Sequence, residues 1–159
     1  MQKNTSACCF TGHRIIPEDE YAAIQKRLEK KMIKPIRQGI DYFCAGGALG
    51  FDTMAALTVL KLKQKFPSIW RVLALPCRDQ TKSWQGEDIK IYNQILEQAD
   101  LVVYVSEQYY PGCMQKRNRY MVDNSSVCLC YLTKQTGGTA YIVNYAKQKG
   151  VRIIRLASE

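Results

Sequence analysis

The sequence predicts a three-layer α/β fold, with one mostly parallel sheet of about six strands between two layers of helices. Short apolar runs alternate with amphipathic helical patterns along all 159 residues. Several runs, such as residues 101–105, are apolar throughout, which is typical of strands covered on both faces. Gly, Thr, Asn and Arg residues gather directly after these runs, where a parallel sheet binds its ligands.

The apolar runs give the strands in chain order. Each is four to six residues long and is bounded by turn residues or by a helical pattern. The predicted strands are residues 7–10, 41–45, 72–75, 101–105, 127–132 and 151–156.

The segments between the strands carry apolar residues spaced three and four apart, which predicts helices with one buried stripe. A further helix within residues 114–124 has a weaker pattern. Strands that alternate with helices are joined by right-handed crossovers, so the architecture is Rossmann-like. The stripes are Tyr21, Ile24, Leu28 and Met32; Phe51, Met54, Leu57 and Leu60; Tyr92, Ile95, Leu96 and Ala99; and Tyr141, Ile142, Tyr145 and Ala146.

Length and composition predict a single domain over residues 1–159. The chain is 47% hydrophobic and 23% charged, which excludes disorder, and no Pro/Ser-rich linker divides it. No apolar run approaches the ~20 residues of a membrane helix. Residues 1–6 are polar and lack the apolar core of a secretion signal. We therefore expect a cytoplasmic protein without a membrane partner.

Seven cysteines without a C-x-x-C pair, beside a single histidine, predict no metal site. Most of the cysteines fall within apolar runs, which favours buried thiols in a reducing compartment. A redox sensor is the alternative, with Cys113 beside Gly112 in a loop as its best candidate.

The formal net charge is +9, from 23 Lys and Arg against 14 Asp and Glu. Such a balance attracts nucleic acids and other phosphates. The densest basic segment, residues 25–38, holds six Lys or Arg and one Glu. A solvated helix face is the favoured interpretation of this segment.

The residues most suited to ligand binding follow five of the predicted strands. In a parallel sheet these loops meet at the carboxyl edge, so they predict one ligand site there. The motifs are Thr11-Gly12-His13-Arg14; Gly46-Gly47-Ala48-Leu49-Gly50-Phe51-Asp52; Pro76-Cys77-Arg78-Asp79-Gln80 with Trp84; Tyr109-Tyr110-Pro111-Gly112 with Lys116-Arg117-Asn118-Arg119; and Thr136-Gly137-Gly138-Thr139.

Two of these motifs are glycine turns that lead into helices, at Gly46, Gly47 and Gly50 and again at Gly137 and Gly138. Such turns bring a phosphate close to the free N–H groups and the positive dipole end of a helix. A tight turn with no ligand is the alternative at both places. In the second motif, the Thr139 hydroxyl adds a donor to an anion nest or caps the helix.

Polar and aromatic side chains complete the predicted site. Arg14, Arg117 and Asn118 are natural phosphate partners. Asp52 either caps a helix or holds a ribose hydroxyl. His13 is either structural or functional, and with Asp52 it is a weak candidate for a catalytic group. Trp84, with Tyr109 and Tyr110, either stacks on a base or anchors its loop.

Four of these motifs, in this order and spacing, resemble the YpsA-like family of the SLOG superfamily. The motifs are Thr11-Gly12-His13-Arg14, residues 46–52, residues 116–123 and Gly137-Gly138-Thr139. That superfamily also holds the LOG phosphoribohydrolases and the DNA-processing proteins Smf/DprA. The resemblance implies a Rossmann-like fold and a pocket for a nucleotide or a nucleotide derivative. The pocket residues that it implies are Thr11, Gly12, Arg14, Gly46, Gly47, Gly50, Asp52, Arg117, Asn118, Gly138 and Thr139.

The LOG enzymes carry a glutamate on the helix after the glycine motif, whereas this sequence continues from Thr139 with Ala140, Tyr141, Ile142 and Val143. Enzyme activity is therefore left open. The first hypothesis is a cytoplasmic domain that senses or sequesters a nucleotide or an ADP-ribose-like ligand, with no required cofactor. The alternatives are LOG-type cleavage of a nucleoside monophosphate and single-stranded DNA binding as in Smf/DprA. A homodimer is a further expectation.

Overall fold

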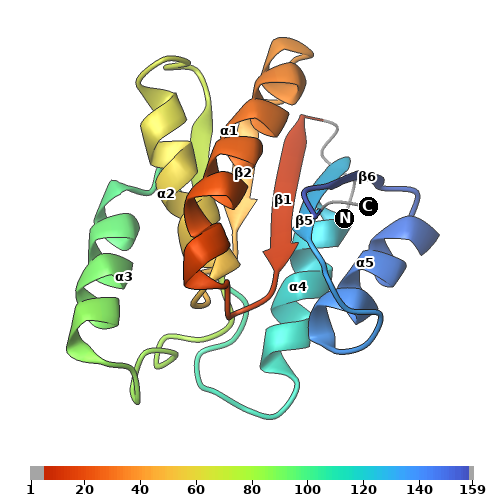
Figure 1. The fold of residues 1–159 in the computed structure, drawn as a ribbon. Coiled ribbons are helices and arrows are strands. Elements are labelled where there is room, and N and C mark those ends of the chain that lie inside the picture. The colour runs from red at the N-terminus through yellow and green to blue at the C-terminus, as the bar shows by residue number, and fades with distance from the viewer. Residues whose placement is uncertain (1–5, 158–159) are drawn as a thin grey trace.

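The computed structural model describes residues 6–157, which form one six-stranded sheet with helices on both faces (Figure 1). Every neighbouring pair of strands is parallel, and the strand order is β4-β3-β2-β1-β5-β6. The predicted fold class is confirmed, and each predicted apolar run overlaps a strand. The strands are β1 (Ala7–Gly12), β2 (Tyr42–Ala45), β3 (Trp70–Leu75), β4 (Leu101–Tyr104), β5 (Val127–Tyr131) and β6 (Arg152–Arg155).

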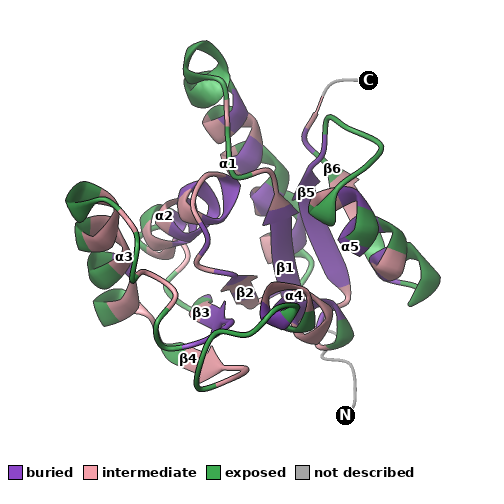
Figure 2. Cartoon of the chain, turned by 90° about the horizontal axis from the view of Figure 1, so that it is seen from below, coloured by how far each residue is buried: buried purple, intermediate pink, exposed green. Residues whose placement is uncertain are grey.

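Five α-helices connect the strands, and a short 3-10 helix, η1 (Glu18–Glu20), precedes the first of them. Viewed onto the carboxyl edge of the sheet, α1, α2 and α3 lie on one side and α4 and α5 on the other (Figure 2). The chain changes sides between β1 and β5, so the topological switch point lies between these two strands. The helices are α1 (Tyr21–Arg37), α2 (Phe51–Lys63), α3 (Gly86–Gln98), α4 (Cys113–Asp123) and α5 (Gly138–Gln148).

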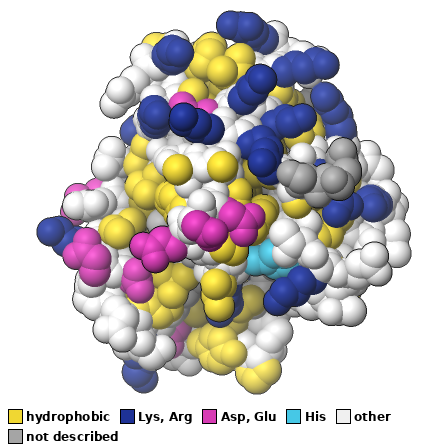
Figure 3. Space-filling view, in the orientation of Figure 1, with side chains coloured by type: hydrophobic (Ala, Val, Ile, Leu, Met, Phe, Trp, Pro, Cys, Tyr) yellow, Lys and Arg dark blue, Asp and Glu magenta, His cyan; other side chains and the backbone are white. Residues whose placement is uncertain are grey.

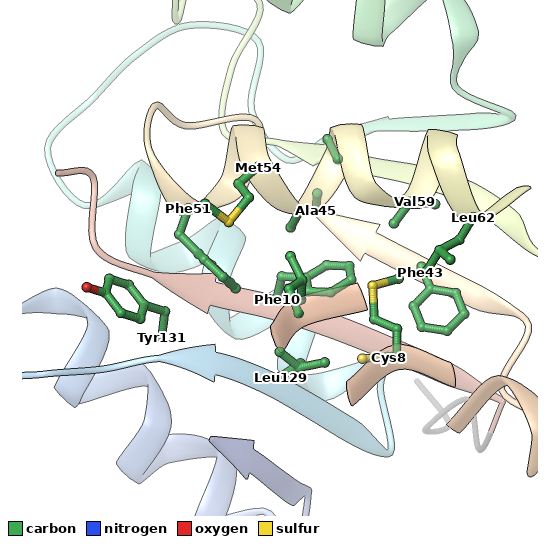
Figure 4. Packing of buried hydrophobic residues seen from close by; sticks show 14 of the residues in the cluster. Cys8, Phe10, Phe43, Ala45, Phe51, Met54, Val59, Leu62, Leu129 and Tyr131 are labelled. Atoms are coloured by element: carbon green, nitrogen blue, oxygen red, sulfur yellow. The ribbon is translucent and has the colours of Figure 1, made fainter. Parts of the chain in front are cut away.

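The larger hydrophobic core lies between the sheet and helices α1–α3, and aromatic rings form its centre (Figure 4). The Phe10 ring lies 6.2 Å from that of Phe43 and 6.5 Å from that of Phe51, between centroids. All three rings are at least 98% buried. This packing fixes the first turn of α2 against the end of β1, because Phe51 is the first residue of that helix.

A second core lies between the sheet and helices α4 and α5, and several cysteines belong to it. Cys9, Cys128 and Cys130 are at most 1% exposed there, as the apolar runs predict. Cys113 does not lie in a loop, although the redox hypothesis predicted one there. It begins α4 and has no exposed surface, so it acts as a small buried side chain.

Two of the predicted apolar stripes contain residues that are not fully buried. Leu57 and Leu60 of α2 are only partly buried, whereas Ala55, Ala56 and Val59 are buried. Alanines on the buried face of α2 let this helix approach its neighbours closely. Tyr21, at the start of α1, is 37% exposed.

The strand β4 is covered on one face only. Its run is apolar throughout, but α4 and α5 lie over the central strands and leave the outer part of their side of the sheet open. Leu101 is therefore 46% exposed, and it lines a shallow groove with Val72 and Val103. The expectation of two covered faces is wrong for this strand.

An ion-pair cluster ties β3 to β4 where the two strands begin. The Asp100 carboxylate accepts hydrogen bonds from the Arg71 backbone N–H at 2.8 Å, from Nε at 2.9 Å and from Nη2 at 2.8 Å. Lys63 adds a contact at 3.5 Å. These donors hold the pKa of Asp100 well below its usual range, with the Arg71 hydrogen bonds as the largest cause.

Candidate functional site

A cavity of about 500 Å³ opens at the carboxyl ends of β2, β3 and β4, and we call it the edge cavity. Its walls come from the loops that follow β1, β2, β3 and β4, and from the first turn of α4. The sheet edge was the predicted place for a ligand. The lining residues are Arg14, Ala48, Leu49, Cys77, Asp79, Gln80, Lys82, Ser83, Trp84, Tyr109 and Met114.

The glycine turn between β2 and α2 forms one wall of this cavity, and its glycines also serve packing. Gly50 has φ +79°, and a Cβ there would overlap the backbone of Arg14. Gly47 has φ +76° and lies against Leu75. The close approach at Gly50 joins the first two loops of the site, since Phe51 N–H also donates to the His13 carbonyl at 3.0 Å.

A buried ion pair supports this turn from behind. The guanidinium of Arg117 lies 3.9 Å from the Asp52 carboxylate, and the two side chains are 3% and 10% exposed. Arg117 Nη1 also donates to the carbonyls of Gly46 and Ala74, and Asp52 Oδ2 accepts from the Ala48 N–H at 3.2 Å. Arg117 therefore links α4 to the ends of β2 and β3.

Burial acts on both members of this pair. It raises the pKa of Asp52 and lowers the pKa of Arg117, and each partner opposes the shift of the other. Gly46 is packed against both side chains, so a Cβ there would overlap them. Asp52 does not cap α2, because its carboxylate is used by the turn and by Arg117. Both charges hold the wall of the edge cavity in place.

The cationic and aromatic side chains of the edge cavity come from the loops after β1, β3 and β4. Arg14 and Lys82 are exposed. Trp84 lies in the same loop as Lys82 and lines the cavity, and its ring packs edge-to-face on Tyr92 with 5.5 Å between ring centroids. Tyr109 is 61% exposed. The cavity thus combines two positive charges and the Asp79 carboxylate with two aromatic surfaces. The cations and the rings suit a phosphorylated ligand with a ring system.

Polar contacts join the loop after β3 to the loop after β4. Arg78 Nε donates to Glu107 at 2.7 Å, and its guanidinium lies 4.0 Å above the ring centroid of Tyr104. The Asp79 carboxylate accepts from the Tyr109 N–H at 3.1 Å. The loops after β3 and β4 are therefore held together on one side of the edge cavity.

His13 lies beside the switch point and is not among the residues that line the edge cavity. Its Nε2 accepts from the Thr133 N–H at 2.9 Å, and its ring packs edge-to-face on Tyr131 at 5.6 Å. Burial lowers the pKa of His13, and the charge of Lys134 lowers it further. Only a neutral His13 can accept the hydrogen bond from Thr133, because both ring nitrogens of a charged histidine are donors. This bond joins the ends of β1 and β5.

The second glycine motif forms the start of α5, outside the lining of the edge cavity. Gly137 has φ +99° and precedes the helix, and both it and Gly138 are exposed. Within the described chain, no side chain caps α5. A Cβ on Gly138 would lie 3.2 Å from the Gln115 amide, so this turn adjoins the first turn of α4. Thr139, the next residue, is partly buried.

The remaining predicted residues lie in supporting positions. Thr11 and Gly12 end β1, and a Cβ on Gly12 would overlap the Phe51 ring. Asn118 accepts from Arg117 Nε at 2.8 Å and donates to Gln115 at 3.3 Å. The structure thus places Arg14, Trp84 and the first glycine turn around one cavity, with Asp52 and Arg117 behind it.

Residues of the edge cavity that were not predicted come mainly from the loop after β3. Lys82 and Ser83 lie two residues and one residue before Trp84, a spacing that marks them as members of the same loop. Met114 lines the cavity from α4, and no sequence pattern pointed to it.

Two kinds of site are absent from residues 6–157. No three His, Cys, Asp or Glu side chains are grouped so that they could hold a metal ion. None of the helices described there combines the length and apolar character needed to cross a bilayer.

Comparison with known proteins identifies relatives of the whole fold. The YpsA family model, described as the YspA SLOG family, matches residues 10–154. The UPF0398 protein BH1768 of Halalkalibacterium halodurans is 33% identical over 129 residues, which are 79% of this chain and 68% of that protein. The SPbeta prophage-derived protein YoqJ of Bacillus subtilis, an uncharacterized protein, is 35% identical over 118 residues, 67% of this chain and 69% of that protein.

Two solved structures share the fold. DNA processing protein A (DprA) of Streptococcus pneumoniae has a TM-score of 0.69 at 12% identity and covers 98% of this chain. This chain spans about half of that protein, 51% of its length. DNA processing protein A of Helicobacter pylori, described for its single-stranded DNA binding mode, has a TM-score of 0.70 at 18% identity, covering 98% of this chain and 67% of that protein.

Proposed function

This chain belongs to the YpsA SLOG family, and on that premise we propose that it binds a nucleotide or a nucleotide derivative in the edge cavity. One observation carries the proposal. Arg14, Trp84 and the glycine turn at the start of α2 come from three separate loops and surround the same 500 Å³ space. That volume is in the range of about 300–1,000 Å³ that small-molecule sites occupy.

Each part of such a ligand has a partner in this arrangement. Arg14 and Lys82 offer exposed cations to the phosphate. The turn before α2 adds the positive end of a helix. Trp84 and Tyr109 offer faces for the base. Arg117 and Asp52 contribute by holding the turn, because their charges are already matched to each other.

Binding without turnover is the form of the proposal that the residues favour. The first turn of α5 carries no acidic residue, and Asp52 is engaged by Arg117. We accordingly expect the bound nucleotide to be recovered intact, with no release of ribose 5-phosphate. A cytoplasmic sensor or sequestering domain is the role consistent with this chemistry.

Thermal shift with purified protein at low salt tests the proposal. The panel holds AMP, ADP, ATP, ADP-ribose and NAD. A ligand at ~100 times its dissociation constant stabilises the fold by about 2.7 kcal/mol. For a domain of this size that raises Tm by about 5–10 °C. A flat response to the whole panel would contradict nucleotide binding.

Variants then locate the site by titration calorimetry. Arg14→Ala is expected to weaken binding about 10- to 100-fold, the usual cost of a lost charge-assisted contact. Arg37→Ala is the matched control, because it removes an exposed arginine from the far end of α1. Unchanged affinity in Arg14→Ala would remove the edge cavity from the proposal.

Single-stranded DNA binding is a second candidate, favoured by the fold shared with DNA processing protein A and by the charge of +9. Lys and Arg side chains gather over α1 and toward the amino edge of the sheet (Figure 3). Phosphate contacts of this kind predict an affinity that falls steeply with salt concentration. Absence of binding to a short oligonucleotide even at low salt would exclude this candidate.

Self-association is a separate proposal, and the open side of β4 is the surface that we assign to it. Leu101, Val103 and Val72 form an uncharged apolar groove there. A second copy would bury this surface without bringing charges of the same sign together at its centre. Light scattering should show a dimer that Leu101→Lys converts to a monomer. A monomeric wild-type protein would contradict the proposal.

A further inference from the structure

A larger cavity, of about 890 Å³, lies on the other side of the switch point, and we call it the α1–α5 cavity. One wall comes from η1 and the first half of α1, and the other from α5. Residues that follow β5 and that end β6 lie between the two walls. None of its lining residues lines the edge cavity, and none belongs to the predicted ligand site.

Four basic side chains line the α1–α5 cavity from four different elements. They are Arg27 of α1, Lys134 of the loop after β5, Lys147 of α5 and Arg155 of β6. In the described chain, no salt bridge joins any of the four to an acidic residue. Four cations that line one cavity favour the binding of an anionic group there.

The charges of these side chains lower the pKa values of groups near the ends of β1 and β5. Burial raises the pKa of Cys130 to about 11, and the charges of Arg155 and Lys147 oppose that rise. Lys134 lowers the pKa of His13 in the same way. Arg27 is held by a hydrogen bond from its Nη1 to the Leu156 carbonyl. These contacts place positive charge at the carboxyl ends of β5 and β6.

Two carboxylates line the same cavity from η1. Asp19 and Glu20 are exposed, and neither forms a salt bridge within residues 6–157. A simple polyanion would be repelled by them. A ligand that carries both an anionic group and hydroxyls satisfies both sets, because carboxylates accept hydrogen bonds from hydroxyls.

We propose that the α1–α5 cavity is a second small-molecule site, which takes a phosphorylated sugar. The phosphate contacts Lys134, Lys147 and Arg155, and the sugar hydroxyls donate to Asp19 and Glu20. This site is independent of the nucleotide proposed for the edge cavity. A free sugar phosphate and a nucleic-acid strand differ in size and charge, so the test separates them.

Titration calorimetry at low salt tests this proposal with ribose 5-phosphate and inorganic phosphate as probes. The double variant Lys147→Gln/Arg155→Gln is expected to bind ribose 5-phosphate at least about ten-fold more weakly than the wild type, from the loss of two charge-assisted contacts. Lys30→Gln/Lys34→Gln is the matched control. It removes the same charge from the exposed face of α1, outside the cavity, and should leave the affinity unchanged.

A second pair of substitutions tests the hydroxyl contacts. Asp19→Asn/Glu20→Gln should weaken ribose 5-phosphate binding while inorganic phosphate binds as well as before or better. Arg14→Ala should keep full affinity for ribose 5-phosphate, which distinguishes this site from the edge cavity. Circular dichroism checks that each variant is folded.

Three results would overturn the proposal. The first is no heat from ribose 5-phosphate with the wild-type protein. The second is an equal loss of affinity in the cavity variant and the matched control. The third is an oligonucleotide whose binding depends on Lys147 and Arg155 when ribose 5-phosphate does not bind, which would assign these cations to nucleic acid.

Discussion

Replacing Arg117 with methionine tests whether the buried ion pair holds the site together. The substitution keeps an unbranched stem, which is shorter than that of arginine, and removes the charge. It leaves the Asp52 carboxylate, only 10% exposed, without its cation, and it leaves the carbonyls of Gly46 and Ala74 without the guanidinium donor. Removing one partner of a buried pair costs about 3–5 kcal/mol. At about 2–4 °C per kcal/mol for a domain of this size, Tm should fall by roughly 6–20 °C.

The effect of pH gives this prediction a specific sign. Burial raises the pKa of Asp52, and Arg117 opposes the rise, so Arg117→Met should raise that pKa further. Asp52 of the folded variant then binds a proton more readily than Asp52 of the unfolded chain. The free energy of unfolding of the variant therefore falls as the pH rises. The loss relative to wild type should therefore be smaller at pH 5 than at pH 7.5.

Urea unfolding followed by circular dichroism, under reducing conditions, measures the free energy of unfolding for each variant. Arg117→Met/Asp52→Asn should recover about 1–2 kcal/mol of the loss, because the asparagine carries no charge and still accepts from the Ala48 N–H. Lys116→Met, an exposed neighbour on α4, is the control and should change stability by less than about 0.5 kcal/mol. A loss below about 1 kcal/mol in Arg117→Met, or no recovery in the double variant, would refute the reasoning.

Three further predictions concern other contacts of the fold. The pKa of His13, measured by NMR, should lie below its ordinary value of 6.5. Because the unfolded chain then binds the proton more readily than the folded protein, the free energy of unfolding should fall as the pH drops through 6.5. An NMR titration midpoint above 6.5 would contradict the assignment. Asp100→Asn should lower the free energy of unfolding, measured with urea at neutral pH, by about 1–2 kcal/mol. Because the pKa of Asp100 is depressed, the difference between the variant and the wild type should shrink as the pH falls below 3.8. A difference that does not change with pH would contradict this prediction. Gly50→Ala should cost more stability than Gly39→Ala, because both have positive φ but only Gly50 lies against another backbone, and equal losses would show that the close approach to Arg14 is unimportant.

The loops of the candidate site were predictable as a set. The motifs after β1, β2 and β3 stand at the ends of apolar runs, and parallel strands bring such ends to one edge. Arg14 and Trp84 could be assigned to that edge from sequence alone. Lys82 needed only its place two residues before Trp84. Met114 carries no such signal, because a methionine at the start of a helix is an ordinary core residue.

The roles of the charged residues were less predictable than their places. The sequence predicts that Arg117 meets a phosphate and that Asp52 caps a helix or holds a sugar hydroxyl, whereas the structure pairs the two with each other at 3.9 Å. Sequence spacing cannot show this, because 65 residues separate them and α4 must first pack beneath the end of β2. His13 similarly meets Thr133, which lies 120 residues away in the chain.

The sequence by itself determined the fold class, because the period of apolar residues sets which segments become strands or helices and strand–helix alternation requires a parallel sheet. It also determined which loops share the carboxyl edge of the sheet. Only the tertiary structure decided which of those side chains line the edge cavity and which pair internally. It alone also brought Arg27, Lys134, Lys147 and Arg155 into one cavity. Periodicity is a local property, whereas the partner of a buried charge depends on which elements pack together.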